Sequence, residues 1–511
     1  MTQAVRTPRW GLAVGGFHVL GLTLLALQLW VRRLPPTSDP IPAPESAEAA
    51  WWGLWPVTYL PPLWFWAGVC TVLTSMVWGW WLLRRSDAPP PRHAEESATK
   101  HPPSTEVRTP RDPSQTQGDG GRYLWPLVSI ALLVAFFAFP IVHTRWGDAY
   151  ILNRTIAWPT PDLRLTHSWQ APLDVRLHSQ LWLWGHASFD WVDAMPVYRL
   201  LSPLAGALYL LALLGLSRDR NLAPAWLSFG LLASLGLLQL FFGYIENYSF
   251  AAAGILLFLL LGRRVVVGSS PLWHASLALG ITNATHPSTV VLAPALLYLG
   301  WVCYGRKPGG TTTTRAVVTQ IVAPMALCAA GTVAFMELGG HGIEALLTSD
   351  RPGGGDASWF VPLFETRTRW ESYTLLSWPH LRDLLNQQAL VAPVVLPSLL
   401  WLALWRRLRL QPPLQPPDVS PATGQTLRFF ATAALCHLLL ITVWNPDYGG
   451  QRDWDLFSLQ AVSTAAWLVA TAQAWIADRR VLVAGLAPLV VLQATQTATW
   501  VYQNTLPWEW P

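Results

Sequence analysis

Residues 143–178 read HTRWGDAYILNRTIAWPTPDLRLTHSWQAPLDVRLH and lie between two strongly apolar runs, 124–142 and 197–216. The segment is dense in ionisable side chains, among them Arg145, Asp148, Arg154, Asp162, Arg164, His167, Asp174, Arg176 and His178. Moving a charge from water toward a bilayer is costly, so such residues usually pair, face water or take part in chemistry. We therefore expect Asp148, which closely follows a helix, to be the centre of an active site.

The composition is that of a membrane protein. Of the 511 residues, 52% are hydrophobic and only 12% are charged, whereas about a quarter are charged in an average soluble protein. Apolar runs of bilayer-spanning length recur, and many of the 32 tryptophans stand at their ends, where an indole suits the headgroup region. The net charge is only +5, and the arginines form short separate clusters, which argues against a nucleic-acid partner. The four cysteines fall inside apolar runs and are expected to be small buried hydrophobes.

The order of apolar runs predicts an all-α polytopic membrane protein with about thirteen transmembrane helices. Residues 1–83 would hold two helices and the outer loop between them. Residues 84–122 are polar and rich in Pro, Ser and Thr, which predicts a disordered linker. Residues 123–511 would form the transmembrane catalytic domain.

Basic residues between spans favour the cytoplasmic side of a membrane. They place the linker in the cytoplasm and the Asp148 segment outside it. Every strong basic cluster after the second span then falls inside under one threading. Arg32 and Arg33 are an exception, because they would lie outside. A short pair of helices, 272–284 and 288–303, is expected to turn near the outer face.

This threading gathers the unusual polar residues on the outer face. They are the Asp148 segment, the pair Glu246 and Asn247, His286, and a loop with Asp447, Arg452, Asp453 and Asp455. A carboxylate at a helix end can act as a general base toward a hydroxyl or an amine, and we assign that role to Asp148. It could instead cap a helix or pair with Arg145 or Arg154.

Arginine binds phosphate oxygens through a planar fork that stays charged. Four arginines are therefore candidates for a phosphate leaving group: Arg145, Arg154, Arg176 and Arg452. Two further substrate-binding candidates, Asp174 and His178, come from the amphipathic stretch 172–178. Histidines at 167, 178 and 286 would donate to phosphate or sugar hydroxyls, although His286 could simply cap a short helix. Four tryptophans are candidates for stacking on sugars or lining a prenyl groove: Trp146, Trp158, Trp169 and Trp454.

The acid in Trp146-Gly147-Asp148, the amphipathic stretch that follows and a long later outer loop resemble the GT-C glycosyltransferases, such as protein O-mannosyltransferases and aminoarabinose transferases. The resemblance covers roughly residue 124 to the end. It implies transfer of a sugar from a polyprenyl-phosphate donor to a glycan, lipid or protein acceptor. It also implies an integral protein of the bacterial inner or plasma membrane, with its site on the extracytoplasmic face. Mannosyltransferases often carry an acidic pair here, whereas Ala149 follows Asp148.

Other interpretations stay open on the sequence alone. Asp148, Asp453 and Asp455 offer the hard oxygen ligands that suit Mg²⁺ or Mn²⁺, although their spacing does not require a metal. A transporter or lipid flippase would show internal repeats and broken helices with charges at mid-membrane. A scaffold without chemistry would not need an acid, several arginines and three histidines in one loop. The depth of Asp148 separates these possibilities.

Overall fold

The computed structural model describes residues 7–35, 46–85, 120–219, 221–305, 313–348, 358–408, 420–476 and 478–508. Apart from one isolated bridge between Phe360 and Trp444, the regular structure of these residues is helical. The long helices are α1 (Thr7–Val31), α3 (Pro62–Arg85), α5 (Gly120–Ala138), α7 (Pro172–Phe189), α8 (Met195–Ser217), α10 (Ser249–Val267), α11 (Leu272–Thr285), α12 (Ala293–Gly305), α13 (Thr314–Leu338), α15 (Trp378–Val391), α16 (Val395–Arg407), α17 (Pro421–Val443), α19 (Gln460–Trp475) and α20 (Arg479–Asn504). The predicted all-α polytopic class is confirmed.

The shorter elements connect these helices. They are α2 (Ala47–Trp51), η1 (Trp55–Thr58), α6 (Ala149–Ile156), η3 (Pro161–Leu163), α9 (Ala225–Leu232), η4 (Gly236–Phe241), η5 (Pro287–Leu292), α14 (Ile343–Thr348) and α18 (Trp454–Ser458). Within the described ranges, eight helices are long and apolar enough to cross a membrane, or nine if the bent pair α15–α16 is one span. Each of the thirteen predicted segments contains helix, but several are short, so the number thirteen remains a prediction.

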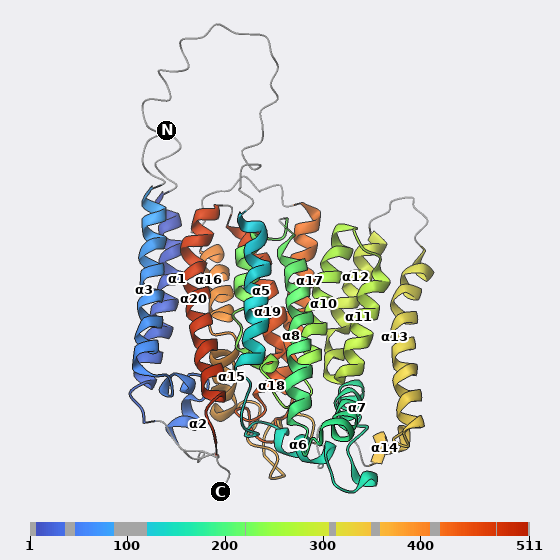
Figure 1. The fold of residues 1–511 in the computed structure, drawn as a ribbon. Helices are drawn as coiled ribbons and strands as arrows, with labels where there is room; N and C mark the ends of the chain where they lie inside the picture. Colours follow the sequence, from blue (N-terminus) through green and yellow to red (C-terminus); the bar gives the residue numbers. More distant parts are fainter. Residues whose placement is uncertain are drawn as a thin grey trace, which may run out of the picture.

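The two ends of the bundle differ (Figure 1). The elements α2, α6, α7, α14 and α18 lie near the lower end as drawn, whereas the chain leaves α3 and enters α5 at the upper end. The predicted linker lies almost wholly outside the described residues, as do four residues of the basic clusters: Arg220, Arg306, Lys307 and Arg409. The polar loops singled out in the sequence therefore gather at one end of the bundle, opposite the ends of α3 and α5 that flank the linker.

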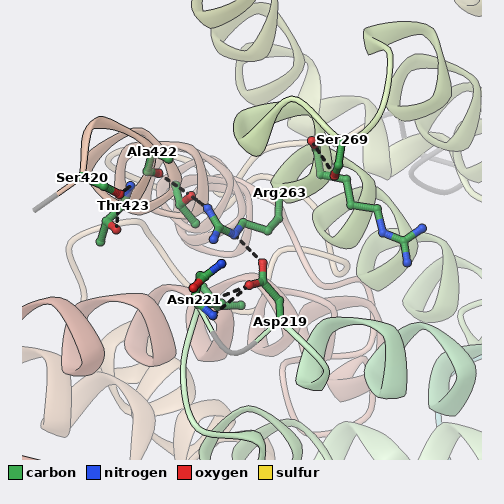
Figure 2. Close-up of polar contacts among 10 residues, drawn as sticks. Asp219, Asn221, Arg263, Ser269, Ser420, Ala422 and Thr423 are labelled. Carbon is green, nitrogen blue, oxygen red and sulfur yellow. Dashed lines mark hydrogen bonds and ion pairs between the residues drawn. The ribbon is translucent and has the colours of Figure 1, made fainter. Parts of the chain in front are cut away.

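The upper end has its own polar contact, which joins α10 to the α8–α9 connection and to α17 (Figure 2). Arg263 is buried; its Nε lies 2.8 Å from Asp219 and its Nη1 donates to the Thr426 hydroxyl at 2.6 Å. Asp219 also accepts the backbone N–H groups of Asn221 and Leu222. Arg263, one of the basic residues between predicted spans, is thus paired with an acid.

The apolar run 223–242, fifth of the thirteen predicted spans, is not one helix. The chain forms α9, breaks, and continues as η4. Three carbonyls at the break accept from side chains of other helices: Leu232 from the Tyr209 hydroxyl at 3.0 Å, Leu231 from Gln493 Nε2 at 3.1 Å and Ser234 from the Thr497 hydroxyl at 2.6 Å. Irregular backbone at membrane depth is tolerated where protein groups satisfy it in this way.

The α9–η4 break packs against a second break in the bundle. The helices α15 and α16 meet at an angle of 100°. A Cβ at Gly236 would overlap the carbonyl oxygen of Leu390, at the end of α15. The two irregular segments therefore pack directly on each other, an approach that requires glycine at position 236.

The two N-terminal helices belong to the same bundle. Both α1 and α3 pack along α20, and α1 also contacts α16. The connection between them carries Glu48, which is buried together with Arg145 of the Asp148 segment. Their side chains form an ion pair of 2.7 Å, and the Arg145 guanidinium lies over the rings of Trp146 and Trp508. Glu48 also accepts from Gln451 Nε2 at 3.1 Å.

We predict that Glu48→Ala strongly destabilises the protein, because it leaves the buried Arg145 charge without its carboxylate. Removing one partner of a buried pair typically costs about 3–5 kcal/mol. Glu344→Ala is the matched control, since Glu344 is exposed on α14. The check is the thermal midpoint of both variants in one detergent. Equal midpoints for the two variants would show that the pair contributes nothing to stability.

Candidate active site

The site is built around the turn Trp146-Gly147-Asp148, which precedes α6. Gly147 adopts a φ of +48°, in the left-handed region that favours glycine. A Cβ at this position would overlap the Glu246 carboxylate and would stand 3.1 Å from Oδ2 of Asp455. Glycine is therefore needed twice over, for the backbone conformation and for the close approach of two carboxyl groups.

Both carboxyl groups are buried and come from distant parts of the chain. Glu246 follows η4 and accepts the backbone N–H of Asp148 in a short hydrogen bond. Asp455, in α18, accepts the Tyr244 hydroxyl at 3.0 Å and its neighbour's N–H, that of Leu456, at 2.8 Å. The Trp454 indole donates to the same Tyr244 hydroxyl at 2.8 Å, which fixes its orientation.

The loop between α17 and α18 closes over this turn. The N–H of Gly147 donates to the Arg452 carbonyl at 2.9 Å, and Arg452 Nη2 lies 3.5 Å from the Gly147 carbonyl. Asp453 accepts the backbone N–H of Tyr448 at 2.9 Å, and the Arg452 guanidinium lies over the Tyr448 ring at 4.7 Å. The Tyr448 hydroxyl in turn bonds the Asp148 carboxylate.

Asp148 itself makes none of the simpler contacts considered for it. It occupies the N-cap position of α6, but its side chain makes no capping hydrogen bond. Arg145 is engaged with Glu48, and Arg154 is exposed and lies over the ring of Tyr150. The Asp148 side chain is half-buried, whereas Glu246 and Asp455 are fully buried. Asp453 is also half-buried, but its carboxylate accepts the Tyr448 backbone N–H. Asp148 is thus one of two carboxylates of this group that a substrate can reach.

Burial and like charge raise the pKa of the whole group. Burial raises the pKa of Asp148, and the Tyr448 hydroxyl and the charge of Arg452 partly oppose this. The pKa of Glu246 is raised by burial and by the neighbouring aspartates. Burial is also the main cause that raises the pKa of Asp453, and it raises that of Asp455 to about 7. Carboxyls this close cannot all ionise easily at neutral pH.

The other predicted residues fall into separate places. Asp174 and His178 are buried on α7, 3.1 Å apart, with the His178 ring stacked on Tyr198. Arg176, also on α7, lies over the Phe335 ring of α13. The structure does not bring Arg154 or Arg176 to the carboxylates by any contact it describes.

The remaining predicted residues border the group. His286 forms a hydrogen bond with the Ser288 hydroxyl at 2.8 Å and packs on the ring of Tyr248. The pKa of the Tyr248 hydroxyl is raised by burial and by the charges of Asp148, Glu246, Asp453 and Asp455. Asn247 is buried beside Glu246. Asp447 lies 3.4 Å from Asn445 Nδ2.

The four tryptophans behave as follows. Trp146 and Trp454 are buried and donate to Asn504 and Tyr244, so they build the floor of the site. Trp169 donates to the His341 carbonyl, and Trp158 is 40% exposed. Of the four, Trp158 is the most accessible to a ligand.

The arrangement does not fit a metal centre. Among the described residues, no group of three or more His, Cys, Asp or Glu side chains is placed to hold a metal ion. Oxygens of Asp453 and Asp455 already accept hydrogen bonds from Tyr448, Tyr244 and Leu456. The Mg²⁺ or Mn²⁺ site that the sequence left open at Asp148, Asp453 and Asp455 gains no support from the described residues.

Sequence reasoning missed several residues that hold the site. Glu48 binds both Arg145 and Gln451, and Asp383 on α15 accepts from the Trp52 indole at 3.1 Å and from the Gly450 N–H at 3.2 Å. One signal was available, because Glu48 is an acid in a stretch otherwise rich in Ala and Trp. Tyr448 carried no signal of its own.

We predict that Gly147→Ala destabilises the protein more than Gly340→Ala does. Both glycines have positive φ, but a Cβ at Gly340 would meet no atom within 4 Å. Strain alone costs about 1–3 kcal/mol at either position, and overpacking adds about 1–3 kcal/mol at Gly147. Thermal midpoints of the two variants measure the difference. A midpoint for the Gly147 variant equal to that of the Gly340 variant would contradict the packing of carboxylates against this turn.

We also predict that stability falls as pH rises from about 4 to 7. The raised pKa of Asp455 means that the folded state binds more protons than the unfolded state in this window, so unfolding becomes easier as the proton is lost. The slope approaches about 1.4 kcal/mol per pH unit for one proton. Asp455→Asn should make the thermal midpoint depend less on pH, whereas Asp162→Asn, at an exposed site, should not. Identical slopes in all three proteins would contradict this.

Comparison with known proteins gives limited information. No protein-family model matches the chain, and no curated protein sequence matches it. Among solved structures, the chain is similar to the Archaeoglobus fulgidus oligosaccharyltransferase tethered with an acceptor peptide containing the NVT sequon. The identity is 14% and the TM-score 0.39, and the match covers 75% of this chain and 55% of that one. A similarity of this extent establishes neither a shared family nor a shared activity.

Proposed function

We propose that the protein is a membrane glycosyltransferase that moves a sugar from a polyprenyl-phosphate carrier to a hydroxyl or amine acceptor on a glycan, lipid or protein. The observation that carries this proposal is the placement of Asp148. It is a half-buried carboxylate with raised pKa, no capping role and a neighbouring arginine, and it belongs to a loop near one end of a helical bundle. A raised pKa makes a carboxylate a better general base. A position near the membrane surface would let it meet an acceptor from water and a donor from lipid.

The proposed step balances as follows. The acceptor oxygen or nitrogen attacks the anomeric carbon, and its proton passes to the Asp148 carboxylate. The bond from the anomeric carbon to the phosphate oxygen breaks, and the carrier phosphate leaves with the electron pair. Arg452 is half-buried beside Asp148, and its Nε has no hydrogen-bond partner in the described part of the chain. We propose that the Arg452 guanidinium binds the phosphate of the carrier.

The buried carboxyls have a supporting role in this proposal. Glu246 holds the Asp148 backbone, and Asp455 holds Tyr244. Neither is exposed, so neither is proposed to touch the acceptor. The GT-C resemblance of the sequence supports a lipid-linked donor and an extracytoplasmic site.

One observation favours the alternative of a transporter or flippase. The chain has two breaks, α9–η4 and α15–α16, as such proteins often do. The donors at the first break are neutral groups, Tyr209, Gln493 and Thr497, and its three carbonyls are already bonded. Asp148 directly precedes α6, and α6 lies toward the lower end of the bundle as drawn (Figure 1). Among the donors to the three carbonyls at the α9–η4 break, none is therefore an ionisable side chain of the kind expected at a transport site.

We predict that Asp148→Asn lowers transfer by about 10² to 10⁴, the usual contribution of one positioned base. The substitution is nearly isosteric and the side chain makes no capping bond, so the thermal midpoint should change little. The assay presents purified protein with a panel of polyprenyl-phosphate sugars and measures transfer and midpoint together. Asp162→Asn, exposed in the same segment, is the control.

Arg452 provides a second arm of this experiment. Arg452→Lys keeps the charge but loses the fork, and should still reduce use of the donor. Near wild-type turnover of the Asp148 variant would refute its role as base. No transfer by the wild type from any donor, with lipid movement across vesicles instead, would favour the transporter.

A further inference from the structure

We propose a second site, unrelated to sugar transfer, that binds an acidic glycerophospholipid of the surrounding bilayer. Its acyl chain would occupy a cavity between α1, α3 and α20, and its phosphate would bind Arg32 and Arg33 at the end of α1. These are the two arginines that contradict the charge pattern of the sequence, since they lie at the end of the bundle predicted to be outside. The proposal does not depend on the glycosyltransferase assignment.

The cavity measures about 310 Å³, at the lower end of the range for ligand sites. Its walls include Leu25 of α1, Val69 and Val72 of α3, and Thr499 of α20. All three helices are candidate membrane spans. At its rim stands Trp64, which is 65% exposed, so the opening faces the surroundings of the bundle, where lipid would lie.

The interior suits hydrocarbon. Three buried polar residues line it, and each donates within the protein. Gln28 Nε2 donates to Gln496 Oε1 at 2.8 Å, Gln496 Nε2 donates to the Gly53 carbonyl at 2.9 Å, and the Thr499 hydroxyl donates to the Gln496 carbonyl at 2.7 Å. Cavities without unsatisfied polar groups stay dry and accept apolar ligands. Gly68 also lines the space, where an added Cβ would touch only Thr495, at 3.4 and 3.7 Å.

A cation stands next to this cavity. Arg32 is half-buried; its Nη1 donates to the carbonyls of Val57 and Thr58, and its guanidinium lies over the Phe65 ring at 5.2 Å. Val57 and Phe65 both line the cavity. None of the three ion pairs among the described residues includes Arg32, and Arg33 beside it is exposed. An arginine that is held by carbonyls, forms no ion pair within the described residues and lies beside an apolar slot matches a phosphate with a hydrocarbon chain.

The position of α20 favours a bilayer lipid over the polyprenyl carrier. One face of α20, with Thr495 and Thr499, lines the cavity. Another carries Trp500 and Asn504, which contact Trp146 under the active-site turn. The helix thus stands between the cavity and Asp148, so a carrier held here would be on the wrong side of α20.

The test is native mass spectrometry of the full chain in detergent, titrated with phosphatidylglycerol, phosphatidylcholine or undecaprenyl phosphate. We expect one phosphatidylglycerol per chain to be retained in preference to the other two. The double variant R32Q/R33Q should weaken this binding by about tenfold or more, the usual effect of losing a hydrogen bond to a charged group. R84Q, which removes an exposed charge at the opposite end of α3, should leave it unchanged.

Gly68→Leu provides an arm that keeps both arginines and fills the cavity. It should also reduce retention of phosphatidylglycerol. If R32Q/R33Q does not fold, this variant alone tests the lipid site. Equal retention of phosphatidylglycerol and phosphatidylcholine, tighter binding of undecaprenyl phosphate, or unchanged binding in G68L would each overturn the proposal. None of these outcomes bears on sugar transfer.

Discussion

The contact between the Glu246 carboxylate and the backbone of the Gly147-Asp148 turn is the constraint on which the site depends. It places Glu246, five residues after η4, against a turn that begins nine residues after α5. Because position 147 has no side chain, Asp455 of α18 can approach the same turn. Three segments far apart in sequence are thereby fixed together, and the Asp148 side chain next to them stays half-buried while Glu246 and Asp455 are buried.

Polar contacts also hold the helices together. Helices in lipid gain little from burying apolar surface on each other, so packing and hydrogen bonds carry more of the association. Glu48 is an example, since one carboxylate engages both the Asp148 segment, through Arg145, and the α17–α18 loop, through Gln451. The N-terminal helices, which the sequence presents as an addition, thus contribute directly to the support of the site.

Much of the architecture could be predicted, because long apolar runs bounded by arginine and tryptophan have few other structures available. The gathering of Asp148, Glu246, Arg452 and Asp455 also followed from the threading. The broken fifth span did not, because its break packs against α15 in a contact that a linear pattern does not contain. Nor could the pattern separate Arg145 from Arg452, since the partner of Arg145 lies about a hundred residues earlier.

Arg145 and Arg452 differ in their acidic partners, and this difference affects the basicity of Asp148. Arg145 is neutralised by Glu48 and is buried between two indole rings, so it contributes to stability and adds little field at the turn. Arg452 faces Asp148 and opposes the effect of burial on its pKa. If the arginine left Asp148 to bind a phosphate, that opposition would weaken and the carboxylate would become more basic. In the proposed glycosyl transfer, donor binding would then raise the basicity of Asp148 before the acceptor loses its proton, which would couple the two proposed substrates through one side chain.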